Sequence, residues 1–304
     1  MIERRPVFDI VTHAILLLGV VFLLVPVWLA IVAASQDIAG VNHVPINWWF
    51  GSHLFENLGE AWRRGDFGAR FVTSFVVAFG VMLGKITVAA LAAFAIVFFD
   101  WRARMAIFWL IFVTLMLPLE VRIVPTYAVA ANALRPFQAI LDMTGLTGLV
   151  ESVSGLRIAL QWRMLNSYAG LILPLVATAT GTFLYRQFFM TVPEDLVEAA
   201  KMDGAGPLRF FWDVLLPLSR TNIAALATIM FVYAWNQYLW PLLVTTEPAR
   251  ATVLVELSRL VPRGDGLPEW HILMAATLIV MLPPLFVVLL TQRWFVRGLI
   301  ATEK

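Results

Sequence analysis

The stretch EAAKMDGAGPLRFFWDVLLP at residues 198–217 lies between two long apolar segments, although its own first half is mixed in polarity. Just ahead of it, Thr191 and Glu194 have the spacing of a capping box, which is typical of a helix start. We therefore predict a short amphipathic helix over 191–203. A segment of mixed polarity between two apolar spans is expected to lie outside the lipid, where another protein can bind it.

The middle of this stretch has the residues of a helix end and a turn. Gly204 fits the left-handed position that ends many helices, and Gly206 with Pro207 directs the turn that follows. A second helix is predicted over 208–216, and it is too apolar to lie free in water. The pattern alone indicates a helical hairpin.

The composition places most of the remaining chain in lipid. Of 304 residues, 61% are hydrophobic and only 14% are charged, whereas a soluble domain carries about 25% charged residues. There are no cysteines, and the four histidines are scattered. These facts exclude disulfides and thiolate chemistry, and they predict no metal site. The net charge of +2 gives no reason to expect a nucleic-acid partner.

Long apolar runs predict an all-α membrane protein, because a helix of about 20 residues crosses the hydrocarbon core and satisfies its own backbone. Six runs are long enough, and we place the transmembrane helices at 10–34, 71–99, 105–126, 167–188, 219–244 and 271–296. The first run is longer than the core of a secretory signal, so we interpret it as a retained anchor. Arginines near the membrane ends, at positions 4, 5, 102 and 104, favour an N-terminus inside the cell.

The hairpin stretch resembles the cytoplasmic loop of the membrane subunits of ABC importers. Their pattern is Glu-Ala-Ala, three residues, Gly, nine residues and Ile-x-Leu-Pro, and this chain departs from it only in having Val214 for Ile. The resemblance implies a type I ABC importer permease fold, in which residues 191–217 form a loop with a coupling helix seated on an ATPase subunit. It also implies that this loop and both chain termini are cytoplasmic.

The resemblance also assigns the residues that contact the ATPase. Glu198 would face a basic group of the partner, Ala199 and Ala200 would allow close approach, and Gly204 would set the angle of the next helix. The full set expected at this contact is Glu198, Ala199, Ala200, Asp203, Gly204, Leu216 and Pro217.

The chain carries no nucleotide site of its own. GVMLGKIT at 80–87 is superficially like a phosphate-binding loop, but three residues separate its glycines instead of four, and it lies within a predicted span. We therefore expect a transport subunit, not an enzyme. The resemblance implies that it binds no cofactor and that a homodimeric partner ATPase uses ATP and Mg²⁺.

Further motifs resemble the maltose-type sugar-importer permeases, and within them the permeases for sn-glycerol-3-phosphate. They are LGKITVAALAAFAIV at 83–97, YRQFFMT at 185–191, PLRFFWD at 207–213 and AWNQYLWPLL at 234–243. The resemblance implies a bacterial inner-membrane protein that forms the translocation path with a second, homologous permease. A periplasmic binding protein would deliver the substrate.

Residues 133–163 depart from this resemblance as an insert of about thirty residues on the periplasmic side. Within it, 149–165 is predicted to form an outer amphipathic helix. Two interpretations stay open: a helix lying on the membrane surface, or extra contact with the binding protein.

Polar residues within the spans are candidates for the translocation path. Lys85 lies near the middle of a span, where a lysine costs about 2.5–3.5 kcal/mol, so it should face protein or a water-filled path. Pairing with Glu120 or snorkelling is the structural alternative. Arg122 is either a second path residue or an interfacial anchor. Two such cations would favour a phosphate monoester.

A second candidate group follows in the fifth span. Asn236 and Gln237 lie beside an aromatic rim of Trp235, Tyr238 and Trp240. The two amides either line the path of a hydroxylated ligand or hydrogen-bond between helices.

Two other functions remain open at this point. One is a permease of the same family for a neutral sugar or oligosaccharide. The other is an ion-driven secondary carrier, a class that often shows paired repeats, which are not evident here.

Overall fold

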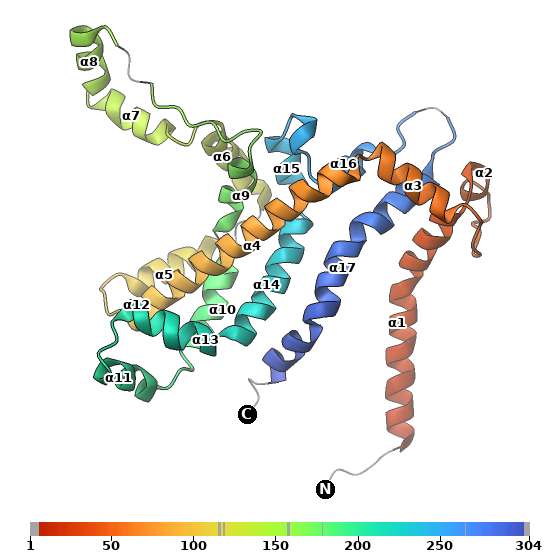
Figure 1. The fold of residues 1–304 in the computed structure, drawn as a ribbon, viewed down its shortest axis with the longest axis horizontal. Helices are drawn as coiled ribbons and strands as arrows, with labels where there is room; N and C mark the ends of the chain where they lie inside the picture. Colours follow the sequence, from red (N-terminus) through yellow and green to blue (C-terminus); the bar gives the residue numbers. More distant parts are fainter. Residues whose placement is uncertain are drawn as a thin grey trace. The chain divides into compact units, whose positions relative to one another are not determined.

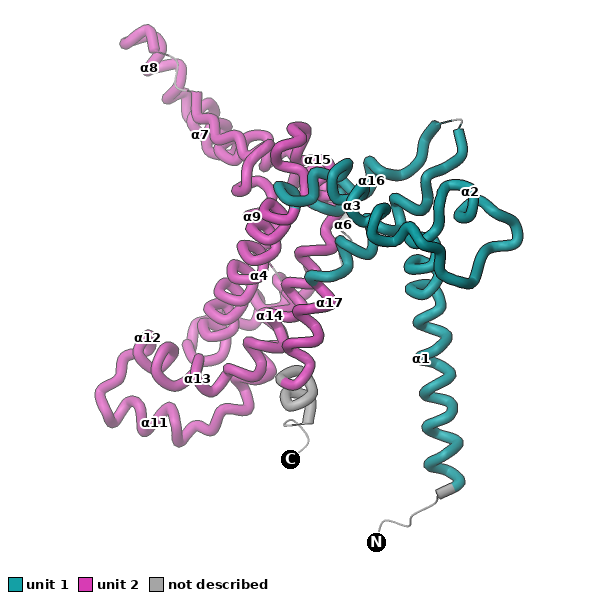
Figure 2. Tube along the Cα trace, turned by 45° about the vertical axis from the view of Figure 1, so that its right-hand side comes forward, with its two compact units in different colours: residues 1–70, 253–283 teal, residues 71–252, 284–304 magenta. Residues whose placement is uncertain are grey.

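The computed structural model describes residues 6–114, 117, 119–156, 159–177, 179–264 and 266–300, and every element in these ranges is helical. Two compact units share the chain (Figure 2). Unit 1 comprises residues 1–70 and 253–283, and unit 2 comprises 71–252 and 284–304. Two long helices, α4 (Phe67–Phe98) and α17 (Trp270–Ile300), contribute residues to both.

Unit 1 holds the first long helix and the short helices that follow it. These are α1 (Pro6–Ser35), α2 (Ile38–Val41), α3 (Leu54–Arg64) and α16 (Val253–Arg259). The end of α1 is fixed by the buried Asn57 of α3, whose side-chain amide donates to the carbonyl oxygens of Ala34 at 2.8 Å and Gln36 at 2.7 Å. Arg64 of α3 pairs with Glu269 at 2.7 Å. This end of unit 1 is therefore held by polar contacts.

Unit 2 contains the remaining helices (Figure 1). They are α5 (Arg104–Val113), α6 (Leu119–Ala131), α7 (Arg135–Met143), α8 (Leu146–Ser154), α9 (Tyr168–Val176), α10 (Ala179–Phe189), α11 (Glu194–Met202), α12 (Pro207–Phe210), the π-helix η2 (Phe211–Leu215), α13 (Leu216–Leu218), α14 (Arg220–Trp235), α15 (Leu239–Val244) and the 3₁₀ turn η3 (Pro248–Arg250).

Three of the described helices are long and apolar enough to cross a membrane: Val7–Ser35, Phe67–Phe98 and Trp270–Arg293. Two bent pairs, α9 with α10 and α12–α13 with α14, raise the number to five if each pair is one span. The remaining predicted span, 105–126, corresponds to the separate short helices α5 and α6. The all-helical class is confirmed, and the number of six spans stays a prediction.

The surface of α1 is almost entirely apolar and exposed. Only 6% of its most apolar window is buried within the chain, and large side chains such as Phe22 and Leu23 are exposed. Apolar surface of this extent is unfavourable in water and favourable in hydrocarbon. The helix is therefore suited to a lipid environment.

The core of unit 2 is an aromatic cluster that connects α4 with the helical hairpin. Small residues of α4 let the rings of other helices approach, and Phe94 lies 5.0 Å from Phe211 between ring centroids. The buried members are Ala89, Ala90, Ala93, Phe94, Tyr185, Phe189, Ala200, Phe210, Phe211, Leu215, Leu226 and Met230. This packing fixes the hairpin to the membrane helices.

Two glycines of α4 let α9 pack closely against it. A Cβ atom on Gly80 would lie 2.6 Å from Ile172, and one on Gly84 would lie 2.5 Å from Val176. Small residues four apart are a common device for close helix packing in membranes. The two glycines of GVMLGKIT, which lack the spacing of a phosphate-binding loop, thus serve helix packing.

Pro174 breaks the hydrogen-bond ladder of α9. Because proline has no N–H, it cannot donate to the carbonyl oxygen of Gly170 one turn earlier. The indole N–H of the buried Trp240 on α15 donates to that oxygen instead, at 3.0 Å. The proline therefore creates the acceptor that holds α15 against α9.

Two short helices within residues 133–163, α7 and α8, form an arm. In Figures 1 and 2, α7 and α8 extend away from the rest of unit 2. The predicted helix over 149–165 is wrong beyond Ser154, because Gly155 takes a left-handed φ of 68° and ends α8. Asn132 then holds the returning segment, accepting from the Trp162 backbone N–H at 3.2 Å.

Replacing Gly84 by leucine should weaken the α4–α9 contact. Overpacking against the stiff, β-branched Val176 is expected to cost about 1–3 kcal/mol. The midpoint of thermal unfolding of the purified protein in detergent measures this. Gly19→Leu on α1 is the matched control, because no atom lies within 4 Å of its added Cβ. Equal midpoints for the two variants would contradict the packing role of Gly84.

Candidate functional site

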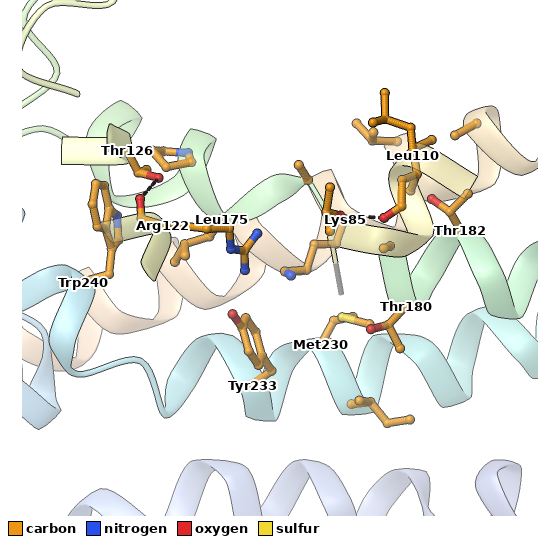
Figure 3. Close-up of a pocket in the computed structure, with 18 of the residues that line it drawn as sticks. Lys85, Leu110, Arg122, Thr126, Leu175, Thr180, Thr182, Met230, Tyr233 and Trp240 are labelled. Carbon is orange, nitrogen blue, oxygen red and sulfur yellow. Dashed lines mark hydrogen bonds between the residues drawn. The ribbon is translucent and has the colours of Figure 1, made fainter. Parts of the chain in front are cut away.

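A cavity of about 630 Å³ lies within unit 2. Its wall is formed by α4, α5, α6, α9, α10, α14 and α15, and Figure 3 shows the residues that line it. The size falls within the range of small-molecule sites, about 300–1,000 Å³. Most of the lining is apolar, with a few polar groups that converge on the interior.

Lys85 of α4 is the buried cation of this cavity. Its side chain is only 6% exposed, and its Nζ lies 4.4 Å from the centre of the Tyr233 ring on α14. None of the ion pairs within the described residues includes it. A cation on a ring face gains about 0.5–2 kcal/mol, and the ring adds no opposing charge. Tyr233 therefore holds Lys85 in place without neutralising it.

Arg122 of α6 supplies a second positive charge. Figure 3 shows its guanidinium pointing into the cavity toward the Lys85 amine, with Tyr233 beneath the space between them. The backbone behind it is fixed by Thr126, whose hydroxyl donates to the Arg122 carbonyl oxygen at 2.6 Å. The like charges of Arg122 and Lys85 repel each other. An anion placed between them would relieve that repulsion.

The other polar lining groups are neutral. They are the hydroxyls of Thr114, Thr126, Thr180, Thr182 and Tyr233 and the indole of Trp240. No carboxylate lines the cavity in the described part of the chain. The arrangement can therefore take up an anion with hydroxyl groups, since cations and hydroxyls both donate to phosphate or carboxylate oxygens.

Metal chemistry has no support here. Among the described residues there is no group of three or more His, Asp or Glu side chains that could hold a metal ion.

The structure separates the predicted path residues. Lys85 and Arg122 come together in the cavity. Trp235 is 2% exposed and stacks on Phe231, with ring centroids 5.8 Å apart. Asn236 and Gln237 follow the end of α14, and none of these three residues is in the described lining. Glu120 belongs to α6, but its side chain lies outside the described part of the structure.

Trp240, expected in an aromatic rim beside the two amides, does line the cavity, whereas the sequence reasoning missed Tyr233. Tyr233 is an aromatic residue in an apolar segment, which by itself is typical of packing. Its spacing could have identified it. Tyr233 precedes Asn236 and Gln237 by three and four residues, so it lies on the same helix face one turn further into the span.

The hairpin ends α11 with a Schellman motif. Gly204 has φ of 72°, which confirms the predicted left-handed conformation. The backbone N–H of Gly204 donates to Lys201 at 3.0 Å, and that of Ala205 donates to Ala200 at 2.9 Å. Ala200 packs into the aromatic cluster, whereas Glu198 and Ala199 are exposed. The helix therefore presents one face to the core and leaves the opposite face free in the described structure.

The predicted capping box at Thr191 is wrong. Its hydroxyl donates back to the Phe188 carbonyl oxygen at 2.7 Å, at the end of the preceding helix. As a result α11 begins at Glu194, with Pro193 in the cap position and no side-chain cap. A threonine between two helices can hydrogen-bond to a carbonyl at the end of the first or to an N–H at the start of the second. Here its hydroxyl bonds to the last turn of α10.

The second half of the hairpin is helical from Pro207 to Leu218, and a π-helix interrupts it before Pro217. Proline removes one N–H and crowds the carbonyl of the preceding turn, and a wider turn relieves this. The N–H of Leu216 accordingly bonds to the Phe211 carbonyl, five residues back. Asp203 caps α11, and both it and Pro217 are exposed.

Residues 70–301 match the family described as the inner membrane component of binding-protein-dependent transport systems. Members of this family are transport subunits, so the chain is not an enzyme, and it works with a binding protein and other subunits.

Relatives cover the whole chain. Proteins of Yersinia enterocolitica, Pectobacterium atrosepticum and Escherichia coli O157:H7 are each 46% identical over 310 residues, with 100% of both chains covered. Each is named sn-glycerol-3-phosphate transport system permease protein UgpE.

The fold also resembles a solved chain, although the sequence identity is only 17%. That structure is a bacterial ABC transporter involved in import of the acidic polysaccharide alginate. The TM-score is 0.74, with 97% of this chain and 99% of the other covered. The type I importer permease fold expected from the hairpin motif is thereby confirmed. The chain belongs to the family of inner membrane components of binding-protein-dependent transport systems.

Proposed function

We propose that this chain is the permease subunit through which sn-glycerol-3-phosphate enters the cell. The observation that carries the proposal is the pair Lys85 and Arg122 in one cavity without a described carboxylate. The names of relatives at 46% identity point to the same substrate.

The charge of the substrate matches the charge of the cavity. A phosphate monoester carries about −1.5 to −2 charges near pH 7 and offers three strong acceptor oxygens. Lys85 and Arg122 would bind these oxygens, and the threonine hydroxyls suit the glycerol part. A neutral sugar gains nothing from two cations, yet the chain must still bear the cost of burying Lys85.

Transport would be powered at the hairpin. In this proposal the exposed face of α11 seats on a homodimeric ATPase, which uses ATP and Mg²⁺, and Glu198 and Ala199 form the contact. Gly204 and Asp203 set the turn, and Leu216 and Pro217 continue the motion into α14. The N- and C-termini then lie in the cytoplasm.

The remaining partners would lie beside the chain in the membrane and on the side opposite to the ATPase. A second, homologous permease would complete the path, and a periplasmic binding protein would deliver the substrate. The arm formed by α7 and α8 exposes apolar side chains, among them Phe137 and Leu149. This supports contact with either the membrane surface or the binding protein.

Two alternatives lead to different observations. A permease for a neutral sugar would transport such a sugar and would not depend on Lys85. An ion-driven carrier would transport without an ATPase. Membership of this family argues against that alternative.

Removing the buried charge should lower the uptake of the anionic substrate. In the complete transporter reconstituted into proteoliposomes, Lys85→Gln is expected to lower uptake of sn-glycerol-3-phosphate by about 10- to 100-fold, because one charge-assisted contact is lost. Lys85→Arg keeps the charge and is the matched control. Unchanged uptake by Lys85→Gln would remove the cavity from the proposal. Wild-type uptake of maltose in place of the phosphate ester would favour the neutral-sugar alternative.

The turn of the hairpin offers a second test with a control two residues away. Neither Gly204 nor Gly206 has an atom within 4 Å of an added Cβ, but only Gly204 has a positive φ. Gly204→Val is therefore expected to strain the turn by about 1–3 kcal/mol and to weaken co-purification with the ATPase. Gly206→Val should assemble normally. Normal assembly and uptake by both variants would contradict the role of the turn.

A further inference from the structure

Arg186, in the last turn of α10, is a cation outside the cavity lining described above. Its guanidinium carbon lies 4.4 Å from the centre of the Phe108 ring on α5, and the ring is 5% exposed. Its Nε is buried without a hydrogen-bond partner. None of the ion pairs among the described residues includes Arg186.

The helical repeat places this pair just beyond the cavity. Thr182 lines the cavity, and Arg186 follows four residues later on the same face of α10. On α5, Ile111 lines the cavity and Phe108 precedes it by three residues. Both helices therefore bring the pair about one turn, or about 5.4 Å, past the lining. This is the end nearer to α11, which the proposed function places in the cytoplasm.

A polar group also lies between the two levels. Tyr185 is fully buried, and its hydroxyl has no hydrogen-bond partner. It lines a narrow hollow together with Lys85 and Met230, and both of those residues also line the main cavity. The hollow has no room for a water molecule in this structure, but it places the Tyr185 hydroxyl between Lys85 and the level of Arg186 along α10.

Lys85 and Arg186 are held by the same chemistry. Each rests on an aromatic face, Tyr233 for one and Phe108 for the other. A carboxylate partner would neutralise the cation and compete with a passing anion, whereas a ring leaves the charge available. An arginine that only anchored the end of a span would extend to the headgroups instead of burying its Nε.

We propose that Arg186 is a second anion site, which receives the phosphate group as it leaves Lys85 and Arg122 and releases it to the cytoplasm. Phe108 holds the guanidinium in place when no anion is present. The inference rests on the proposed function, because it needs an anionic substrate moving toward α11.

The test separates release from binding in the complete transporter in proteoliposomes. For Arg186→Gln we expect uptake of labelled sn-glycerol-3-phosphate to fall about tenfold or more, since one charge-assisted contact is lost. Labelled substrate should then remain on the transporter in stoichiometric amount after rapid gel filtration. Lys85→Gln should retain none. Arg186→Lys keeps the charge and should transport within about threefold of the wild type.

The control is Arg104→Gln, because Arg104 lies on α5 as Phe108 does but has a side chain that is 39% exposed and paired with Asp100 at 3.4 Å. It should transport normally. Wild-type uptake by Arg186→Gln, or loss of both uptake and retained substrate, would overturn the inference alone. So would an assembled Arg186→Lys variant with uptake about tenfold or more below the wild type, and this measurement serves if the glutamine variant fails to assemble. A wild-type transporter that moves no glycerol phosphate would overturn the proposed function and this inference with it.

Discussion

A buried lysine without a described acidic partner is the constraint on which this structure depends. Burying Lys85 within a span is expensive, and the surrounding helices reduce that cost without removing the charge. The Tyr233 ring lies against the Lys85 ammonium group. Gly80 and Gly84, on the same helix as Lys85, let α9 pack closely against that helix. Trp240, held by the acceptor that Pro174 leaves open, completes the wall. A positive charge maintained in this way is useful only to a partner that is negative.

The same helix connects the cavity with the hairpin. Lys85 lies one helical turn before Ala89, where the aromatic cluster of α4 begins. Phe94 of that cluster touches Phe211 of the hairpin, and Ala200 of α11 belongs to it too. Because packed aromatic cores deform little, a displacement of α11 would move α4 and the cavity wall together. This contact is a physical route by which a motor outside the membrane would act on a site within it.

The local features were predictable from the sequence, whereas the long-range ones were not. Gly204 and the two helices of the hairpin follow from turn chemistry and spacing, and the cost of burying Lys85 follows from its place in an apolar run. The partner of Thr191 could not be foreseen, because two helix ends compete for one hydroxyl. Trp235 was judged by its polar neighbours, but its ring packs between helices distant in sequence. The pairing of Gly80 with Ile172 likewise depends on which helices meet, which periodicity does not give.

The most direct test is a structure of the assembled importer trapped with sn-glycerol-3-phosphate in the membrane cavity. We predict phosphate density within hydrogen-bond distance, about 2.7–2.9 Å, of Lys85 Nζ and the Arg122 guanidinium. The glycerol part should lie toward the threonine hydroxyls. Substrate density elsewhere in the path, with Lys85 still resting on the Tyr233 ring, would contradict the account.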